Sequence, residues 1–136
     1  MLEGIESTAR MYLMVDQSTV EPGKSHRRPG PHIDGTWSEK GGGSRTPDFE
    51  AKKAFERELV ILASDVEGCV AYVGSYDPMG FKPGGDCSDM DLSGLERVTL
   101  KAGFAYVGTA ATIHESIPIK RACQRTLVRI NVPEPS

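Results

Sequence analysis

The chain has 136 residues, of which 26% are charged and 38% hydrophobic, and its formal net charge is −3. That length provides for one core, so we expect a single domain over residues 1–136. The negative charge argues against nonspecific nucleic-acid binding, and the apolar runs are too short to cross a bilayer. We therefore expect a cytoplasmic protein (in a host cytoplasm or a virion if phage-encoded) that binds neither nucleic acid nor membrane.

Three cysteines, Cys69, Cys87 and Cys123, are scattered along the chain. An odd number without close spacing fits neither a disulfide framework nor a zinc site. We expect a reducing compartment, with the cysteines packed as small apolar side chains.

The first predicted strand, at 9–15 (ARMYLMV), is short and apolar. A polar stretch follows from about residue 16 to residue 47 and ends in GGGSRTP. Such a length is uncommon for an irregular connection in a compact domain. We expect a long polar arm or loop that carries a functional element or is partly mobile.

Residues 48–58 favour a short helix, and LVILAS at 59–64 is typical of a buried strand. The turn DVEG follows. The β-branched and aromatic run CVAYVGSY at 69–76 then predicts a second strand, paired with the preceding one as a hairpin.

A loop at 77–91 precedes the alternating segment RVTLK at 97–101, and residues 104–116 hold one or two further strands. Along 126–132 the odd-numbered residues share one face of a strand and the even-numbered residues the other. Seven or eight short strands indicate a mainly β sandwich or barrel with one short helix.

His32 and Asp34 stand at positions i and i+2, so on a strand both side chains point to the same side. An imidazole and a carboxylate together make two thirds of the facial triad that binds non-haem Fe(II). His114, between a predicted strand and Pro118, is the candidate for the third ligand. Taken singly, the first pair also fits a turn in the loop PGPHIDG, and His114 fits a bond to a backbone carbonyl in the core.

Arg125 follows His114 with ten residues between them and begins the last strand, which we expect to run antiparallel to the one carrying His114. The order HxD, distant His, then Arg resembles the Fe(II)/2-oxoglutarate-dependent dioxygenases. The string HESIP at 114–118 looks like the distal-histidine region of their prolyl-hydroxylase-like members. The resemblance implies a double-stranded β-helix (jelly-roll, cupin-like) barrel. It further implies His32, Asp34 and His114 as metal ligands and Arg125 as the anchor for the distal carboxylate of 2-oxoglutarate.

The cofactors that this resemblance implies are Fe(II) and 2-oxoglutarate, and the implied reaction is hydroxylation of a peptide side chain or a small molecule. One feature departs from the family. Only 31 residues precede the HxD pair, so we expect no helices of the kind that usually buttress such a barrel before it.

Other arginines leave alternatives open. Arg121 competes with Arg125 for the anchor position and equally fits a solvated surface charge. Arg129, in phase with Leu127, fits either the barrel interior or a pair with a surface carboxylate. The run KSHRR at 24–28, which contains His26, fits a solvated loop or a site for an anionic partner.

Two functions without catalysis compete with the oxygenase. One is a β-barrel assembly module, such as a phage capsid decoration or another virion protein, in which the polar arm reaches a neighbouring subunit of a homo-oligomer or virion. The other is a cupin-like binder of a small ligand or metal. Iron content, succinate formation and native mass distinguish the three.

Overall fold

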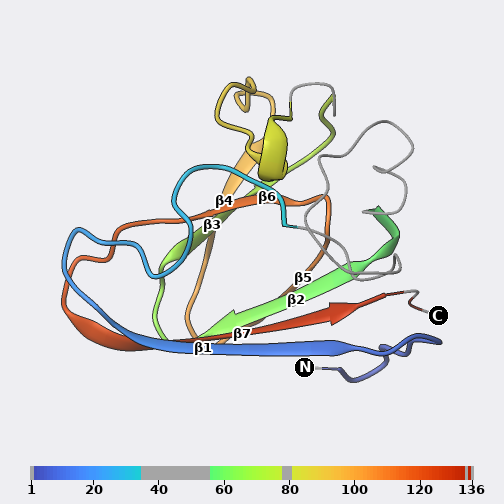
Figure 1. The fold of residues 1–136 in the computed structure, drawn as a ribbon, viewed down its shortest axis with the longest axis horizontal. Coiled ribbons are helices and arrows are strands. Elements are labelled where there is room, and N and C mark those ends of the chain that lie inside the picture. The colour runs from blue at the N-terminus through green and yellow to red at the C-terminus, as the bar shows by residue number, and fades with distance from the viewer. Residues whose placement is uncertain (1, 35–55, 78–80, 134, 136) are drawn as a thin grey trace.

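A computed structural model describes residues 2–34, 56–77, 81–133 and 135. Seven strands follow one another along the chain (Figure 1). They are β1 (Tyr12–Val20), β2 (Leu59–Ser64), β3 (Cys69–Val73), β4 (Glu96–Leu100), β5 (Ala105–Thr109), β6 (Ile113–Ser116) and β7 (Cys123–Val132), with the short 3-10 turn η2 (Pro83–Gly85) between β3 and β4.

The strands form two antiparallel sheets, one of four strands in the order β1-β7-β2-β5 and one of three in the order β4-β3-β6. Figure 1 shows the two sheets as separate layers, with the chain from β1 to Asp34 passing from one to the other. Two facing antiparallel sheets joined by crossing connections are the jelly-roll architecture. The expected mainly β fold is thereby confirmed.

The last strand shows the expected alternation. Arg125 and Leu127 are buried on the side that faces the second sheet, where Leu127 packs with Cys69 and Leu100. The even-numbered Ile130 lies on the other side. There the N-terminal segment, with Ile5 and Met11, packs against Ile61, Ile130 and Val132. The ten-residue strand β7 is thus paired on both edges, and the side chain of Arg125 points toward the second sheet.

A second cluster fixes the segment that contains the HxD pair. Ile33 is 1% exposed and packs with Cys87, Ala110, Ala111 and Ile113. Complete burial of an isoleucine side chain contributes about 1.5–3 kcal/mol. This burial therefore holds the backbone between His32 and Asp34 against the barrel, although that backbone belongs to no named strand.

The predicted hairpin was wrong. β2 pairs with β5 and β7, whereas β3 pairs with β4 and β6, so the two strands lie in different sheets and form no hairpin. The strands β6 and β7 belong to opposite sheets and are not hydrogen-bonded neighbours. The residues of β3 from Cys69 to Ala71 are all buried. A strand buried in this way requires packing neighbours on more sides than a single hairpin partner provides.

Several boundaries also differ from expectation. The first strand begins at Tyr12 and continues to Val20, so the start of the expected polar arm is regular structure. Of the expected helix at 48–58, Glu56 and Arg57 are helical and residues 48–55 lie outside the described part of the chain, as do residues 35–47 of the arm. Among the described residues, no helix has the length and apolar character that a bilayer crossing requires.

Candidate metal centre

His32 and His114 come from distant parts of the chain and lie directly opposite each other. The backbone N–H of His32 donates to the carbonyl of His114 at 3.0 Å, and the N–H of His114 donates to the carbonyl of His32 at 2.9 Å. This exchange defines an antiparallel hydrogen-bonded pair, whose side chains share one face. The two imidazole rings accordingly lie 4.7 Å apart between centroids.

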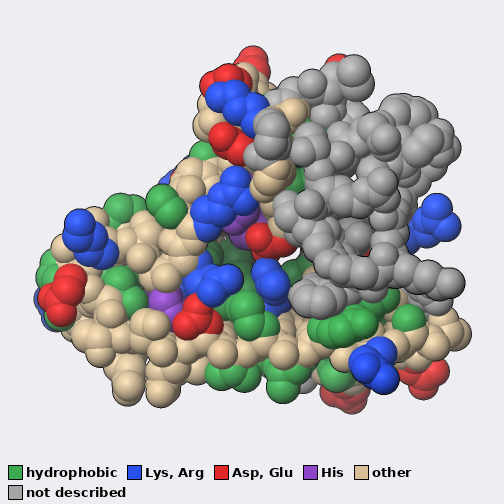
Figure 2. Space-filling model, in the orientation of Figure 1, with side chains coloured by type: hydrophobic (Ala, Val, Ile, Leu, Met, Phe, Trp, Pro, Cys, Tyr) green, Lys and Arg blue, Asp and Glu red, His purple; other side chains and the backbone are tan. Residues whose placement is uncertain are grey.

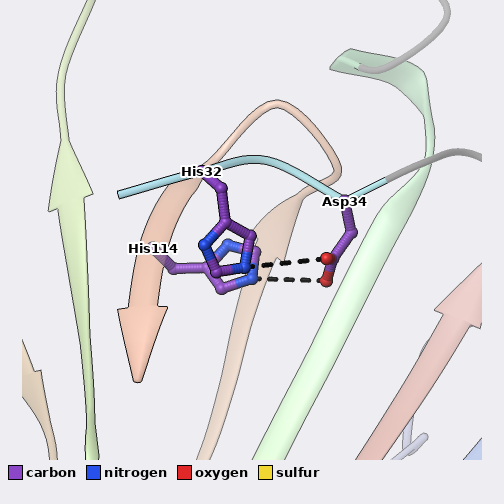
Figure 3. A group of neighbouring side chains, drawn as sticks. All are labelled: His32, Asp34 and His114. Carbon is purple, nitrogen blue, oxygen red and sulfur yellow. Dashed lines mark ion pairs between the residues drawn. The ribbon is translucent and has the colours of Figure 1, made fainter. Parts of the chain in front are cut away.

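Asp34 completes a cluster with the two histidines (Figure 3). Its Oδ2 lies 3.3 Å from Nε2 of His114, and its Oδ1 lies 3.8 Å from Nε2 of His32. One ligand atom from each of the three residues lies within 4.8 Å of the others. Figure 3 shows both rings pointing toward the carboxylate, His114 from β6 and the other two residues from the extended segment that precedes residue 35. The structure thus brings together the three residues proposed from the sequence as ligands.

The ring orientation of each histidine is set by a backbone carbonyl two residues earlier. Nδ1 of His32 lies 2.7 Å from the carbonyl oxygen of Gly30, and Nδ1 of His114 lies 2.9 Å from that of Thr112. A carbonyl only accepts hydrogen bonds, so both Nδ1 atoms carry the proton. In the neutral rings Nε2 then presents its lone pair to the cluster, an arrangement in which the other ring N–H donates to a carbonyl as it does in many metal-binding histidines.

Arg129 also reaches this cluster. Its Nη1 donates to Oδ2 of Asp34 at 2.6 Å, and its side chain is 16% exposed. Of the two positions that the sequence left open for Arg129, the structure shows the interior one.

Charges and burial shift the pKa values of all three candidate ligands. Burial raises the pKa of Asp34, but the hydrogen bond and charge of His114 and the charge of Arg129 outweigh it and leave that pKa well below its usual range. Burial lowers the pKa of His114, but Asp34 more than compensates, so its net shift is upward. For His32 burial dominates, and its pKa lies below the ordinary value. A neutral His32 beside an ionised Asp34 leaves a nitrogen lone pair facing a carboxylate.

That donor set fits a divalent cation. Two imidazole Nε2 atoms and one carboxylate on one side of an ion form the facial triad typical of non-haem Fe(II). A cation between them would relieve the repulsion between the lone pair of His32 and the carboxylate of Asp34. Ligand atoms about 2 Å from one ion in a facial arrangement lie roughly 3 Å apart, so the side chains, whose ligand atoms lie within 4.8 Å of one another, would have to draw together around the ion.

A cavity of about 460 Å³ opens beside the cluster and is lined by both sheets. Apolar side chains such as Met14, Leu62 and Leu127 form much of its wall, and Arg27, Arg28, Arg129 and Glu56 supply charge. Figure 2 shows basic and acidic side chains gathered around a hollow between the two layers.

Sequence reasoning identified the cavity-lining residues only in part. The apolar ones occupy alternate positions of predicted strands, which is a usable signal, but nothing local shows which face encloses a cavity. The run at 24–28 predicts either a solvated loop or a site for an anionic partner, and its residues Arg27 and Arg28 line the cavity.

Arg125, the expected anchor, is completely buried next to this cavity but is not one of the residues that line it. Its guanidinium donates to the carbonyl of Val66 at 2.8 Å and to Ser64 Oγ at 3.2 Å, and it contacts Cys69 Sγ at 3.3 Å and Nδ1 of His26 at 3.1 Å. Of these partners, Cys69 lines the cavity. The competing Arg121 is exposed and also lies outside the lining.

Neither a family model nor a curated protein matches the sequence. Among solved structures, the chain is similar to EvdO2 from Micromonospora carbonacea var. aurantiaca complexed with 2-oxoglutarate, with a TM-score of 0.51 and 17% identity, over 98% of this chain and 54% of that one. A second structure of EvdO2 gives a TM-score of 0.46 at 17% identity, over 93% and 53% of the two chains.

The chain thus spans about half the length of EvdO2. At this level of identity the similarity shows the fold alone. The fold is a cupin-like double-stranded β-helix, as the strand order of the two sheets also indicates.

Proposed function

We propose that this protein is a non-haem Fe(II)/2-oxoglutarate-dependent oxygenase that hydroxylates a peptide side chain or a small molecule. One observation carries the proposal: His32, Asp34 and His114 converge with their ligand atoms within 4.8 Å, beside a cavity of substrate size. The complex of EvdO2 with 2-oxoglutarate is consistent with it, because a protein of similar fold binds that molecule.

Each residue of the candidate site would have a distinct role. His32 and His114 would hold the metal through Nε2, and the carbonyls of Gly30 and Thr112 fix their rings. Asp34 would supply the third ligand, positioned by Arg129. The bound iron, with 2-oxoglutarate and dioxygen, would supply the oxidising power. The apolar part of the wall would limit the access of water to a bound substrate, which protects a reactive centre from side reactions.

Arg125 is the proposed anchor for the distal carboxylate of 2-oxoglutarate. Its strand position faces inward, and its guanidinium contacts Cys69, which belongs to the cavity wall. A planar guanidinium binds a carboxylate through two parallel hydrogen bonds. A carboxylate that replaced the weak contact to the Cys69 sulfur would gain a charge-assisted bond in a buried position.

Metal binding and turnover of purified variants test the proposal. We expect His32→Ala and Asp34→Ala to abolish Fe(II) binding under anaerobic conditions, with circular dichroism showing an intact β fold. His26→Ala is the matched control for iron binding alone, because His26 lies outside the cluster but contacts the guanidinium of Arg125. Wild-type protein should convert 2-oxoglutarate to succinate, and Arg125→Gln should lose this turnover while it retains iron. Unchanged iron affinity in both ligand variants would refute the metal site.

A second candidate is a non-catalytic assembly module, and one observation favours it. Leu13 and Val15 on the edge strand β1 are 67% and 59% exposed. Exposed apolar side chains on the outer side of a sheet are typical of surfaces that pack against another subunit. A large native mass without bound metal would favour this function over the oxygenase.

A further inference from the structure

The cavity wall carries two arginines whose hydrogen-bonding capacity is incompletely used. Arg28 donates from Nη1 to the carbonyl of Gly84 at 2.8 Å and forms no salt bridge with the described residues. The neighbouring Arg27 differs, because its Nη1 pairs with Asp16 at 2.5 Å. Arg28 therefore brings a positive charge to the cavity that no carboxylate of the described chain pairs with.

Arg129 has a similar deficit deeper in the cavity. Its Nη1 is bonded to Asp34, but its Nε is buried and has no hydrogen-bond partner among the described residues. A buried donor without a partner costs about 1–3 kcal/mol. Because this Nε is inaccessible from the cavity, a ligand acceptor would recover that cost only after the Arg129 side chain shifts to expose it.

The charge balance of the wall points the same way. Among the described residues that line the cavity, three are basic (Arg27, Arg28 and Arg129) and two are acidic (Asp34 and Glu56), and Arg27 is already paired with Asp16 outside the lining. Under the proposed function the charge of Asp34 is further offset by a divalent ion. Figure 2 shows basic side chains at the rim of the hollow. In a partly enclosed site an excess of positive charge attracts anions.

We propose that Arg28 and Arg129 bind an anionic group of the oxygenase substrate, so that the substrate is a small molecule or peptide bearing a carboxylate or a phosphate. The identification of this anion as part of a substrate rests on the proposed function, whereas the anion site itself does not. Guanidinium groups bind both kinds of anion through paired hydrogen bonds. Placed beside the candidate metal ligands, such an anion would fix the substrate relative to the reactive centre.

Calorimetric titration of the metal-free protein in EDTA isolates the anion site from iron chemistry. Methyl phosphate and acetate serve as separate probes, and the probe that binds with the higher affinity identifies the class of anion. We expect Arg28→Gln and Arg129→Gln each to weaken binding of that probe about tenfold or more, because each removes a charge-assisted hydrogen bond. Arg121→Gln is the matched control, since Arg121 is exposed and lies outside the cavity lining.

Equal affinities of wild type, Arg28→Gln and Arg129→Gln would overturn the inference, whether or not succinate formation is observed. Should Arg129→Gln fail to fold, Arg28→Gln decides, and Arg129→Lys should retain part of the affinity. In a second arm, the anaerobic Fe(II) protein is titrated with the probe in the presence of saturating 2-oxoglutarate. Simultaneous binding supports a substrate subsite. Mutual exclusion would show that the two arginines hold the cosubstrate and would overturn the assignment to substrate.

Discussion

A single carboxylate, that of Asp34, determines the electrostatics of the candidate metal centre. Its two oxygens face His32, His114 and Arg129 at distances between 2.6 and 3.8 Å. Without a metal, the carboxylate favours the protonated form of His114. With a metal, Nε2 of His114 would have to give up its proton, so protons and metal compete for the same atom.

This competition predicts a pH dependence of metal binding. The pKa of His114 lies above its ordinary 6.5, so a proton occupies Nε2 over a wider range than in a free histidine. We expect the apparent affinity for Ni²⁺, used as an air-stable probe, to fall about tenfold per pH unit below that pKa and to level off above it. Titrations at pH 6, 7 and 8 measure this. An affinity independent of pH over that range would contradict the role of His114 as a ligand.

Cys87 offers a second test at the level of one residue. Burial, with a smaller effect from the charge of Asp86, raises the pKa of its thiol to about 12, and its side chain is inaccessible. Because the thiolate is the reactive form, we expect iodoacetamide at pH 8 to leave Cys87 unmodified in the folded protein. The partly exposed Cys123 should react first. In 8 M urea, a control that unfolds the chain, all three cysteines should react.

At the level of elements, the turn η2 supports the segment that carries His32 and Asp34. The N–H of Ile33 donates to the carbonyl of Gly85 at 2.9 Å, and the N–H of Cys87 donates to the carbonyl of Pro31 at 2.9 Å. Gly85 has a φ of +73°, and a Cβ at this position would collide with the carbonyl oxygen of Ile33. The turn therefore requires glycine both for its backbone conformation and for close approach.

Gly85→Ala should destabilise the protein by about 1–3 kcal/mol and weaken metal binding, because the collision displaces the backbone between two candidate ligands. Gly84→Ala is the matched control. Its φ is +75°, but its Cβ would meet no atom within 4 Å, so it carries the backbone strain alone. Urea denaturation and Ni²⁺ titration of both variants separate the two effects. Equal metal affinities in the two variants would show that η2 does not position the ligands.

The strands themselves were largely predictable, and their pairing was not. Alternation along 126–132 and the apolar run at 59–64 correspond to β7 and β2. Whether Leu59 pairs with a strand ten residues away or with Val132 depends on burial on both faces, which no local pattern encodes. The cluster of His32, Asp34 and His114 was predictable from the sequence, because the HxD spacing is local and a facial triad requires only one further histidine. The cavity position of Arg129 was not, since both faces of β7 lie against other parts of the protein.

On the scale of the whole molecule, the candidate site joins distant parts of the chain. His32 and Asp34 precede β2, whereas His114 belongs to β6 and Arg129 to β7. A partly folded chain therefore does not assemble the cluster, and a metal that binds it binds only the native state. Such a ligand stabilises the fold by mass action.

We therefore expect Ni²⁺ at about 100 times its dissociation constant to stabilise the wild type by about 2.7 kcal/mol. Urea denaturation with and without the ion measures this increment. His114→Ala serves as the control and should show no increment. An equal effect of the ion in both proteins would mean that it binds elsewhere.

Ile33 separates the two ligands of the HxD segment and turns the opposite way, into the cluster with Cys87 and Ile113. The depth to which that side chain inserts thus sets how far the neighbouring imidazole and carboxylate project. Exchange of Ile33 for a bulkier or slimmer aliphatic residue would shift both donors together and leave their chemistry intact. The ion preference of the proposed metal site would therefore be adjustable from a position outside its ligand set.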